Sequence, residues 1–289
     1  MKIMRNQRAK GAMTVQPNRR MVKYPKHGMR MAELWLDAPI EKPAGCDLLV
    51  LHQYSRLPRG VFSWPFSTLT VNLHAGEDQL FDGLNRNTKY KVRRASTKDM
   101  IECVYEPQAT EAICAEFLDF FNEFADTKGL KRLSARQMRA RAQASTVRFS
   151  RALSGGATVV WHVHAVTQEK ATLLHSASQF RQLDDNEARA VVGRANRLLH
   201  WRDMLFFKAE GKSVYDFGGW YAGTENVELL RINKFKEGFG GVRTDQFNGG
   251  IALSWRGWLY LELRQHFSAS QRRAIKAKLL SLAALRGSS

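Results

Sequence analysis

The stretch that decides the fold is Ser213-Val-Tyr-Asp-Phe-Gly-Gly-Trp220, followed further along by Ile232-Asn-Lys-Phe-Lys-Glu-Gly-Phe-Gly-Gly241. A short apolar strand runs into a double glycine in the first half, and a second glycine-rich break closes the second half. Glycine permits a sharp turn and lets another group approach the backbone closely. Aromatic residues beside both breaks can wall a pocket, with Lys234 and Lys236 as cations at its mouth. The pattern is typical of a site for an elongated anionic substrate; the alternative is two surface turns with aromatic residues packed beneath them.

The composition is that of a globular chain with an ordinary core. It has 289 residues, of which 44% are hydrophobic. No apolar run reaches the roughly 18 residues of a membrane span, and the polar, basic start lacks the apolar segment of a secretory signal. Three scattered cysteines (Cys46, Cys103 and Cys114) form no Cys-x-x-Cys pair, which favours a reducing compartment. We therefore expect a cytoplasmic location, with peripheral contact to the inner membrane face as a further expectation.

The net charge of +18 is concentrated at the two ends of the chain. Residues 1–31 carry nine Lys and Arg and no acid, residues 264–289 carry six and no acid, and +3 remains for the body. The tails can bind RNA phosphates or an anionic membrane face without sequence specificity. Two further basic clusters, at 86–94 and 128–141, are interpreted as solvated helix faces that could add to such binding.

The pattern along the chain predicts an α+β fold, with a mixed, mostly antiparallel sheet flanked by helices. Residues 1–31 are expected to form a flexible basic arm, and residues 32–99 a reduced N-terminal lobe of short strands with one helix over 77–95. Residues 100–263 predict a strand, helices over 111–127 and 135–144, a three-strand meander, a helix over 185–210 and a strand over 213–217. A hairpin is expected over 250–263 around Trp255-Arg256-Gly257, and a basic C-terminal helix within 264–289.

Several common chemistries are disfavoured because their motifs are missing. The sequence has no P-loop, no His-Glu-x-x-His and no Gly-x-Ser-x-Gly elbow.

Tyr215-Asp-Phe-Gly-Gly219 and the later Phe235-Lys-x-Gly-Phe-Gly-Gly241 resemble the C-terminal signature of Fem-type aminoacyltransferases and related acyltransferases of the GNAT superfamily. Two upstream pieces are similar to the same family: the basic run 80–95, with Lys89 where arginine is usual, and the helix over 195–211. Together they cover roughly residues 70 to 260, and the order of elements over 100–263 is that of a GNAT core. Fem-type enzymes pair two such cores, whereas here the first would be much reduced.

The resemblance implies acyl transfer to an amine without a covalent nucleophile. It implies aminoacyl-tRNA as co-substrate, in cell-envelope or related metabolite biosynthesis, with no bound cofactor and tRNA gripped by the basic tails and helices. An alternative is an acyl-CoA-dependent N-acyltransferase acting on an amino sugar of a surface polysaccharide. A third possibility is an inactive GNAT scaffold that binds RNA or membrane. The resemblance implies no particular oligomeric state.

The acyl-CoA alternative depends on a partial motif. GNAT proteins that bind acetyl-CoA resemble one another in an Arg/Gln-x-x-Gly-x-Gly/Ala run that opens the helix after the meander and holds the pyrophosphate. Residues 190–195 match its glycine and final alanine, but Ala190 stands where Arg or Gln is expected, and the run begins inside the predicted helix.

The candidate site is built around the two glycine-rich breaks. As catalytic residues we expect Asp216, to orient an ammonium group or accept a proton, Lys236, to stabilise phosphates or an oxyanion, and His175, as general base for the acceptor amine. The expected substrate-binding residues are Tyr215, Gly218, Gly219, Trp220, Lys234, Phe235, Arg181, Arg93 and Lys91.

A histidine cluster in the meander provides a further hypothesis. With a two-residue turn at Gln168-Glu169, His162 would lie opposite His175, and His164 would share their face. Three imidazoles on one face could bind a metal, but a one-residue slip in register destroys the cluster. No metal site is therefore predicted, and a single histidine acting as base is favoured.

Overall fold

The computed structural model describes residues 21–35, 38–106, 108–179 and 185–266, and it confirms the α+β class. One ten-stranded sheet runs in the order β1-β2-β3-β10-β4-β9-β8-β7-β6-β5. Neighbouring strands are antiparallel except β2 with β3 and β8 with β9. The expected tails, Arg181 and the C-terminal helix lie wholly or partly outside the described residues.

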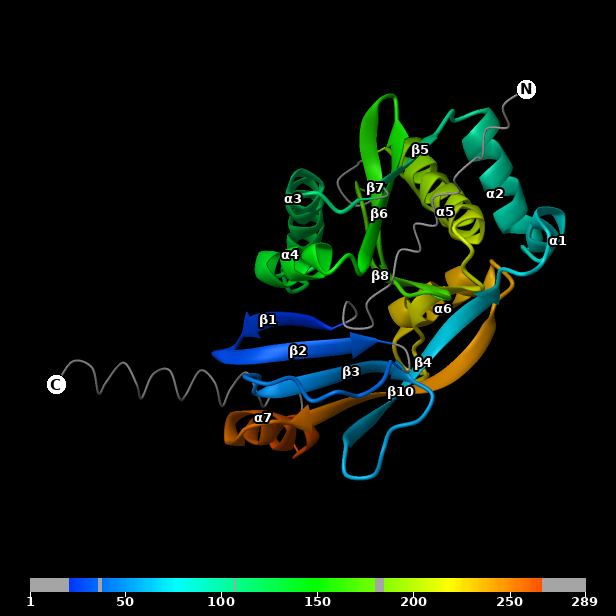
Figure 1. The fold of residues 1–289 in the computed structure, drawn as a ribbon. Coiled ribbons are helices and arrows are strands. Elements are labelled where there is room, and N and C mark those ends of the chain that lie inside the picture. The colour runs from blue at the N-terminus through cyan, green and yellow to red at the C-terminus, as the bar shows by residue number, and fades with distance from the viewer. Residues whose placement is uncertain (1–20, 36–37, 107, 180–184, 267–289) are drawn as a thin grey trace, which may run out of the picture.

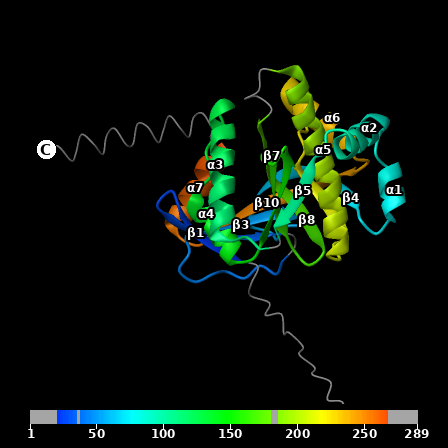
Figure 2. The same cartoon turned by 90° about the horizontal axis from the view of Figure 1, so that it is seen from above.

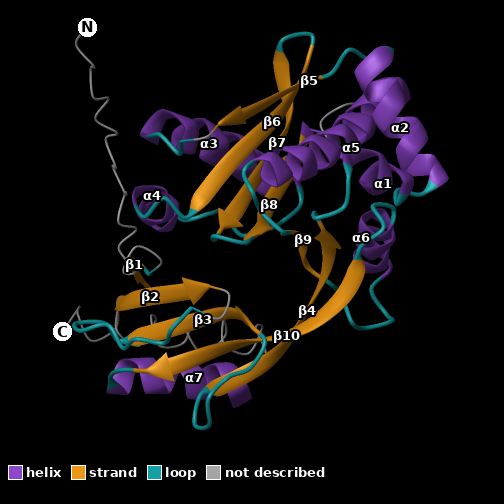
Figure 3. Cartoon of the chain, turned by 45° about the vertical axis from the view of Figure 1, so that its right-hand side comes forward, coloured by secondary structure: helices purple, strands orange, loops and turns teal. Residues whose placement is uncertain are grey.

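The first half of the sheet contains β1 (Val22–Lys26), β2 (Met29–Trp35), β3 (Leu48–Tyr54), β10 (Val242–Ala252) and β4 (Phe62–Asn72). Figure 3 shows the long strands β4 and β10 running between the two halves of the molecule. Because β10 lies between β3 and β4, a C-terminal segment completes the N-terminal lobe. The boundary expected at residue 99 therefore does not separate two sheets.

The expectation of a flexible arm over 1–31 is wrong for residues 22–31, which lie in the β1–β2 hairpin. Val22 and Tyr24 are buried, whereas the intervening Lys23 is exposed, so the charges of this segment mark the solvent face of a strand. The turn is made by His27 and Gly28, both with positive φ (53° and 73°), as a tight hairpin requires.

The hairpin expected over 250–263 is also wrong: β10 ends at Ala252 and α7 spans Trp255–His266. Gly257 is not a turn residue. It lies in α7 against Asp47, where an added Cβ would be only 1.9 Å from the Asp47 carbonyl oxygen. The glycine lets the helix pack closely on the sheet, which the sequence pattern could not distinguish from a turn.

The second half of the sheet follows the expected order from strand to strand. It contains β5 (Glu102–Glu106), α3 (Glu111–Thr127), α4 (Ala135–Gln143), the meander β6 (Val147–Ser154), β7 (Ala157–Val166) and β8 (Lys170–Ser178), then α5 (Asn186–Ala209) and β9 (Val214–Gly219). Ser134 caps α4, because its side chain accepts the Gln137 amide. Helices α3 and α4 cover one face of this half and α5 covers the other (Figures 1 and 2).

The single helix expected over 77–95 is two helices, α1 (Glu77–Asp82) and α2 (Arg86–Thr97). Asn85 starts the second because its side chain accepts the Thr88 amide as an N-cap. Helix α2 packs on α5, and α6 (Val227–Glu237) follows β9. Together α2, α5 and α6 place the residues of the candidate site.

Candidate functional site

The site forms where two parallel strands separate. Strands β8 and β9 pair only at Lys170↔Val214, Ala171↔Tyr215 and Thr172↔Asp216. Just beyond, β8 contains a bulge: His164 pairs with Leu173 and Val163 with His175, so that Leu174 is an extra residue. The strands then diverge and leave backbone groups of the sheet without a ladder partner.

Gly218 lies on β9 at this point of separation. Its φ is +70°, and a Cβ added there would be 2.6 Å from the carbonyl oxygen of Leu173. Only glycine adopts this backbone conformation without strain and also allows so close an approach. The double glycine of the sequence therefore sets how closely β9 approaches β8 before the two strands diverge.

A cavity of about 460 Å³ opens between the separated strands, within the usual size of ligand sites. Helices α5 and α6 form much of its wall, with residues of β8, β9 and the end of α3. Its lining includes Asn196, Arg197 and His200 of α5 and Phe235 and Lys236 of α6.

Lys236 is a buried cation at the inner end of α6. Its Nζ donates to the carbonyl oxygens of Gly219 at 2.5 Å and Gly218 at 3.3 Å. Burial lowers its pKa to about 8, although the nearby Asp216 carboxylate acts in the opposite direction. No carboxylate lies within ion-pair distance of this ammonium in the described part of the chain. It can therefore stabilise negative charge that develops in the cavity.

Arg197 adds a second cation to the cavity wall. Its guanidinium lies 4.6 Å from the ring centroid of Phe235 and donates to the Gly193 carbonyl at 3.2 Å. Burial lowers the pKa of this guanidinium, and its Nε has no hydrogen-bond partner among the described residues. An unpaired, partly desolvated arginine favours an anionic ligand.

Asp216 lies beneath the cavity and does not line it. Its carboxylate accepts from Lys170 Nζ at 2.5 Å, from the Gly218 amide at 2.7 Å and from Thr68 Oγ1, and Gln53 Nε2 lies at 3.3 Å. The ammonium that Asp216 orients is thus that of Lys170. With its oxygens occupied, Asp216 holds β9 and Gly218 in place.

The bulge overturns the expected histidine cluster. Because of the extra residue, His175 faces α3, where its ring packs 5.3 Å from that of Phe121. Burial lowers the pKa of His175 to about 3, and the residue does not line the cavity described above, so it is not placed to act on an amine bound there. His162 and His164 point to the other face, and the third histidine there is His200 of α5.

Sequence reasoning missed His200 and Asp203 because only the docking of α5 on the sheet brings them to β7. A signal was present: Asn196, His200 and Asp203 are polar residues at helical spacing on a face that is otherwise apolar. Together with His162 of β7, His200 and Asp203 have potential metal-ligand atoms that lie within 4.8 Å of one another.

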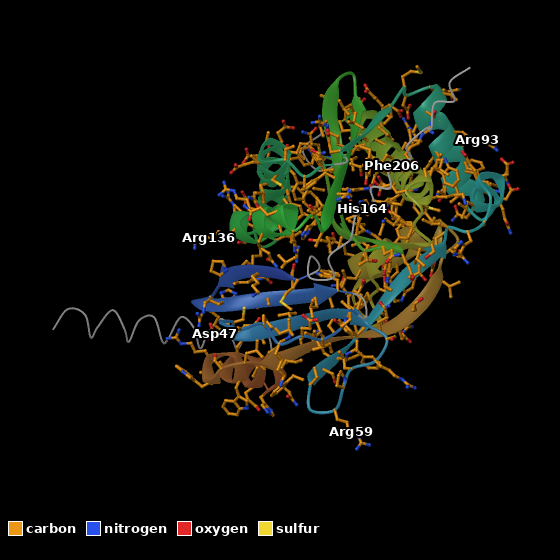
Figure 4. All side chains as sticks on the ribbon, in the orientation of Figure 1. Asp47, Arg59, Arg93, Arg136, His164 and Phe206 are labelled. Atoms are coloured by element: carbon orange, nitrogen blue, oxygen red, sulfur yellow. The ribbon has the colours of Figure 1, made fainter. Side chains whose placement is uncertain are left out.

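The remaining predicted residues do not line the cavity. Tyr215 is fully buried behind the cavity, and Trp220 is half-buried against the main core. Lys91 is half-buried, and burial, followed by the neighbouring Arg197, lowers its pKa. Arg93 is exposed on the outer side of α2 (Figure 4), where it lines a basic groove of about 520 Å³. Gly219 lies against Phe66, and Lys234 is exposed.

No model of a known protein family matches the chain, and no curated protein matches its sequence. Solved structures do match. FemX has a TM-score of 0.53 at 12% identity, with 68% of this chain and 64% of the FemX chain covered. The match thus spans less than two thirds of FemX.

L-PGS from Bacillus licheniformis has a TM-score of 0.47 at 11% identity, with 81% of this chain and 83% of that chain covered. A tandem GNAT protein from the clavulanic acid biosynthesis pathway has a TM-score of 0.39 at 12% identity, with 78% of each chain covered. The FemX match shows that this chain shares the fold of FemX. Among the described helices, none combines the length and apolarity needed to cross a membrane.

Proposed function

We propose that this protein transfers an acyl group to an amine and so forms an amide, in the cavity between β8 and β9. The observation that carries the proposal is the separation of these strands beside the β8 bulge, with one buried and one half-buried cation and aromatic rings around the opening. The fold shared with FemX supports it.

The chemistry needs no covalent intermediate. The acceptor nitrogen attacks the carbonyl carbon of an activated ester, the ester C–O bond breaks, and the leaving oxygen takes up a proton. Backbone N–H groups freed where the strands part, together with the Lys236 ammonium, would stabilise the oxyanion. Positioning of the two reactants supplies much of the remaining acceleration. None of the three cysteines, all of them described, lines the cavity, in keeping with direct transfer.

We propose aminoacyl-tRNA as the donor, and an amine of an envelope component or a related metabolite as the acceptor. The partial CoA motif supports this choice, because residues 190–195 lie inside α5, where backbone amides are committed to the helix. The α5 N-terminus is capped by the Asp185 carboxylate, which accepts the Ala188 amide at 2.7 Å. A pyrophosphate there would meet a negative charge and one fewer free amide.

The basic groove on α2 fits the same donor. Its lining residues are Arg86, Lys89, Tyr90, Arg93, Arg94, Thr97 and Lys98. Lys and Arg with an exposed tyrosine are the residues that contact RNA phosphates and bases. This donor would place the reaction in the compartment that holds charged tRNA.

A donor assay tests the proposal. The purified protein is incubated with a panel of amines and either tRNA charged with ¹⁴C-labelled amino acids or ¹⁴C-acetyl-CoA. We expect labelled amide from the charged tRNA, abolished when RNase is added first. Product from acetyl-CoA that resists RNase would instead support acyl-CoA-dependent N-acylation, and no product from either donor would refute the acyltransferase proposal.

A further inference from the structure

A chain of buried polar side chains leads away from the cavity. His200 lines the cavity, and its Nδ1 lies 2.9 Å from the hydroxyl of Tyr215. The same hydroxyl lies 3.0 Å from Nε2 of His164. That nitrogen lies 3.6 Å from Oδ2 of Asp203. Figure 4 shows His164 between the sheet and α5, away from the outer surface.

Hydrogen bonds of His162 connect further side chains to this row of polar groups. His162 lies between Asp203 and Asn196, with Nδ1 2.7 Å from the Asp203 carboxylate and Nε2 2.8 Å from the Asn196 amide oxygen. The three histidines, Asp203 and Tyr215 are each at most 2% exposed. Burying so many polar groups is costly unless they are mutually hydrogen-bonded; each side chain of this network has a partner, although Nδ1 of His164 has none among the described residues.

The chain ends at a second cavity. Asp203 lines a space of about 450 Å³ between α5 and β5, and exposed Arg202 lies at its rim. Phe206, labelled in Figure 4, lines the same space. No residue lines both cavities. The polar side chains therefore lead from one cavity to another on a different side of α5, with one gap of 3.6 Å between His164 Nε2 and Asp203 Oδ2.

We propose that His200, Tyr215, His164 and Asp203 form a proton relay that carries the acceptor's proton from the reaction cavity to the second cavity and so to solvent. This inference rests on the proposed function. When an ammonium becomes an amide, its nitrogen loses two protons. One is taken up by the leaving oxygen, and the other must reach solvent.

The first two transfers use atoms within hydrogen-bonding distance, and the last crosses the 3.6 Å between His164 Nε2 and Asp203 Oδ2. His200 accepts the proton at Nε2, which has no hydrogen-bond partner among the described residues, and releases its Nδ1 proton to the Tyr215 oxygen. Tyr215 passes its own proton to Nε2 of His164. The resulting imidazolium faces the Asp203 carboxylate, which hands the proton to water in the second cavity.

The resting charges of the relay suit transient transfer. Burial lowers the pKa of His164 to about 4, and burial also lowers the pKa of His200 and raises that of Tyr215. All three are therefore neutral at neutral pH, so a proton passes through without being held. The charged and titratable groups around the relay come from every element packed against it: Arg197 and Asp203 of α5, His162 of β7, Lys236 of α6, Asp216 of β9 and Cys103 of β5.

A substitution at the centre of the relay tests the proposal. Tyr215→Phe removes the shared hydroxyl and keeps the ring. Its matched control is Tyr24→Phe, which removes the hydroxyl of another buried tyrosine, one that donates to Glu33 in the other half of the sheet. The assay measures transfer from tRNA charged with ¹⁴C-labelled amino acids to the best amine of the panel, between pH 6.5 and 8.

We expect Tyr215→Phe to lower kcat by about 10²-fold at pH 7 with KM unchanged, as for loss of general-base catalysis. The variant would depend on acceptor that is already neutral in solution, so its rate should rise about tenfold per pH unit, whereas wild type and Tyr24→Phe stay nearly flat. A drop of the same size at every pH, or no drop at all, would overturn the relay while leaving the transferase proposal intact. Absence of transfer by wild type would refute both.

A second variant covers the case in which Tyr215→Phe does not fold. His200→Ala opens space beside the cavity, and free imidazole should restore at least a tenth of the lost rate by accepting the proton in its place. No rescue in a folded variant would contradict the relay. One equivalent of zinc in purified wild type, lost in His162→Ala, would also overturn it, because a metal would occupy the lone pairs that the relay uses.

Discussion

Replacing Arg141 by methionine should destabilise the fold by about 3 kcal/mol at neutral pH, because it leaves a buried carboxylate without its cation. Glu33 of β2 is fully buried and accepts from Arg141 of α4 at 2.6 Å through Nε and at 3.1 Å through Nη2. Breaking such a pair costs about 3–5 kcal/mol. Tyr24 and Gln137 remain as donors to Glu33, at 3.1 and 3.3 Å, which places the expected loss at the lower end.

Through Glu33, the unfolding free energies of the wild type and of Arg141→Met should depend on pH in opposite directions. Burial alone would raise the pKa of Glu33, but the Arg141 guanidinium, its hydrogen bonds to the carboxylate and the adjacent His52 ring hold that pKa well below its usual range. In the wild type, the pair therefore contributes stability that is present above the unfolded-state pKa and is lost as the pH falls below it. In Arg141→Met, burial is no longer opposed, the pKa of Glu33 rises, and protonation relieves the penalty as the pH falls.

Urea unfolding followed by tryptophan fluorescence at pH 7.5 and pH 5 measures both effects. The difference in unfolding free energy between wild type and variant should narrow at the lower pH. The matched control is Arg139→Met on the same helix, whose pair with Glu111 at 3.4 Å is exposed on both sides and should contribute less than about 1 kcal/mol. An Arg141→Met loss no larger than that of Arg139→Met, or a loss identical at both pH values, would refute the reasoning.

Three further predictions concern the site. Gly218→Ala should lower the melting temperature and abolish transfer, because the added Cβ would lie 2.6 Å from a backbone oxygen at a residue whose φ is +70°. Gly219→Ala, where the nearest atom would be 3.6 Å away, should have a mild effect, and equal effects of the two variants on melting and transfer would contradict this. Lys236→Ala should lower kcat by about 10²-fold, whereas Lys234→Ala, at an exposed lysine, should not, and an unchanged rate in Lys236→Ala would remove Lys236 from the mechanism. Wild-type activity should fall above pH 8, because the Lys236 ammonium, whose pKa is lowered to about 8, then loses its proton. Arg93→Gln should weaken tRNA binding and reduce the slope of log affinity against log salt by about 1, so an unchanged slope in filter binding would exclude a phosphate contact there.

Much of the second half of the fold could be predicted because its signals are local. The helix over 111–127 is found with the expected bounds, since its apolar positions recur at helical spacing and Thr110 caps its start. The order of strands and helices from β5 to β9 also follows the sequence pattern. The first half could not be predicted in the same way. Lys23 and its neighbours were interpreted as a basic arm because charge alone does not reveal which face of a strand is buried.

The residues of the candidate site were likewise predicted only in part from the sequence. The sequence indicated the cluster of Phe235 and Lys236 beside a double glycine, and the structure places both residues in one cavity. It assigned His175 as a base, and the bulge at Leu174 turned that side chain to the opposite face. Register within a strand pair depends on a single extra residue, and no turn signal in the meander announces it.

The sequence by itself determined the periodic elements, the capped helices and the glycine positions, because these depend on residues within a few positions of one another. Only the tertiary structure decided that β10 enters between β3 and β4, that β8 and β9 diverge after three pairs, and that His200 joins His164 around one hydroxyl. These features join residues far apart in the chain, such as Gln53 and Asp216. Such contacts form only when non-local burial outweighs the entropy of closing long loops, and local sequence carries no record of that balance.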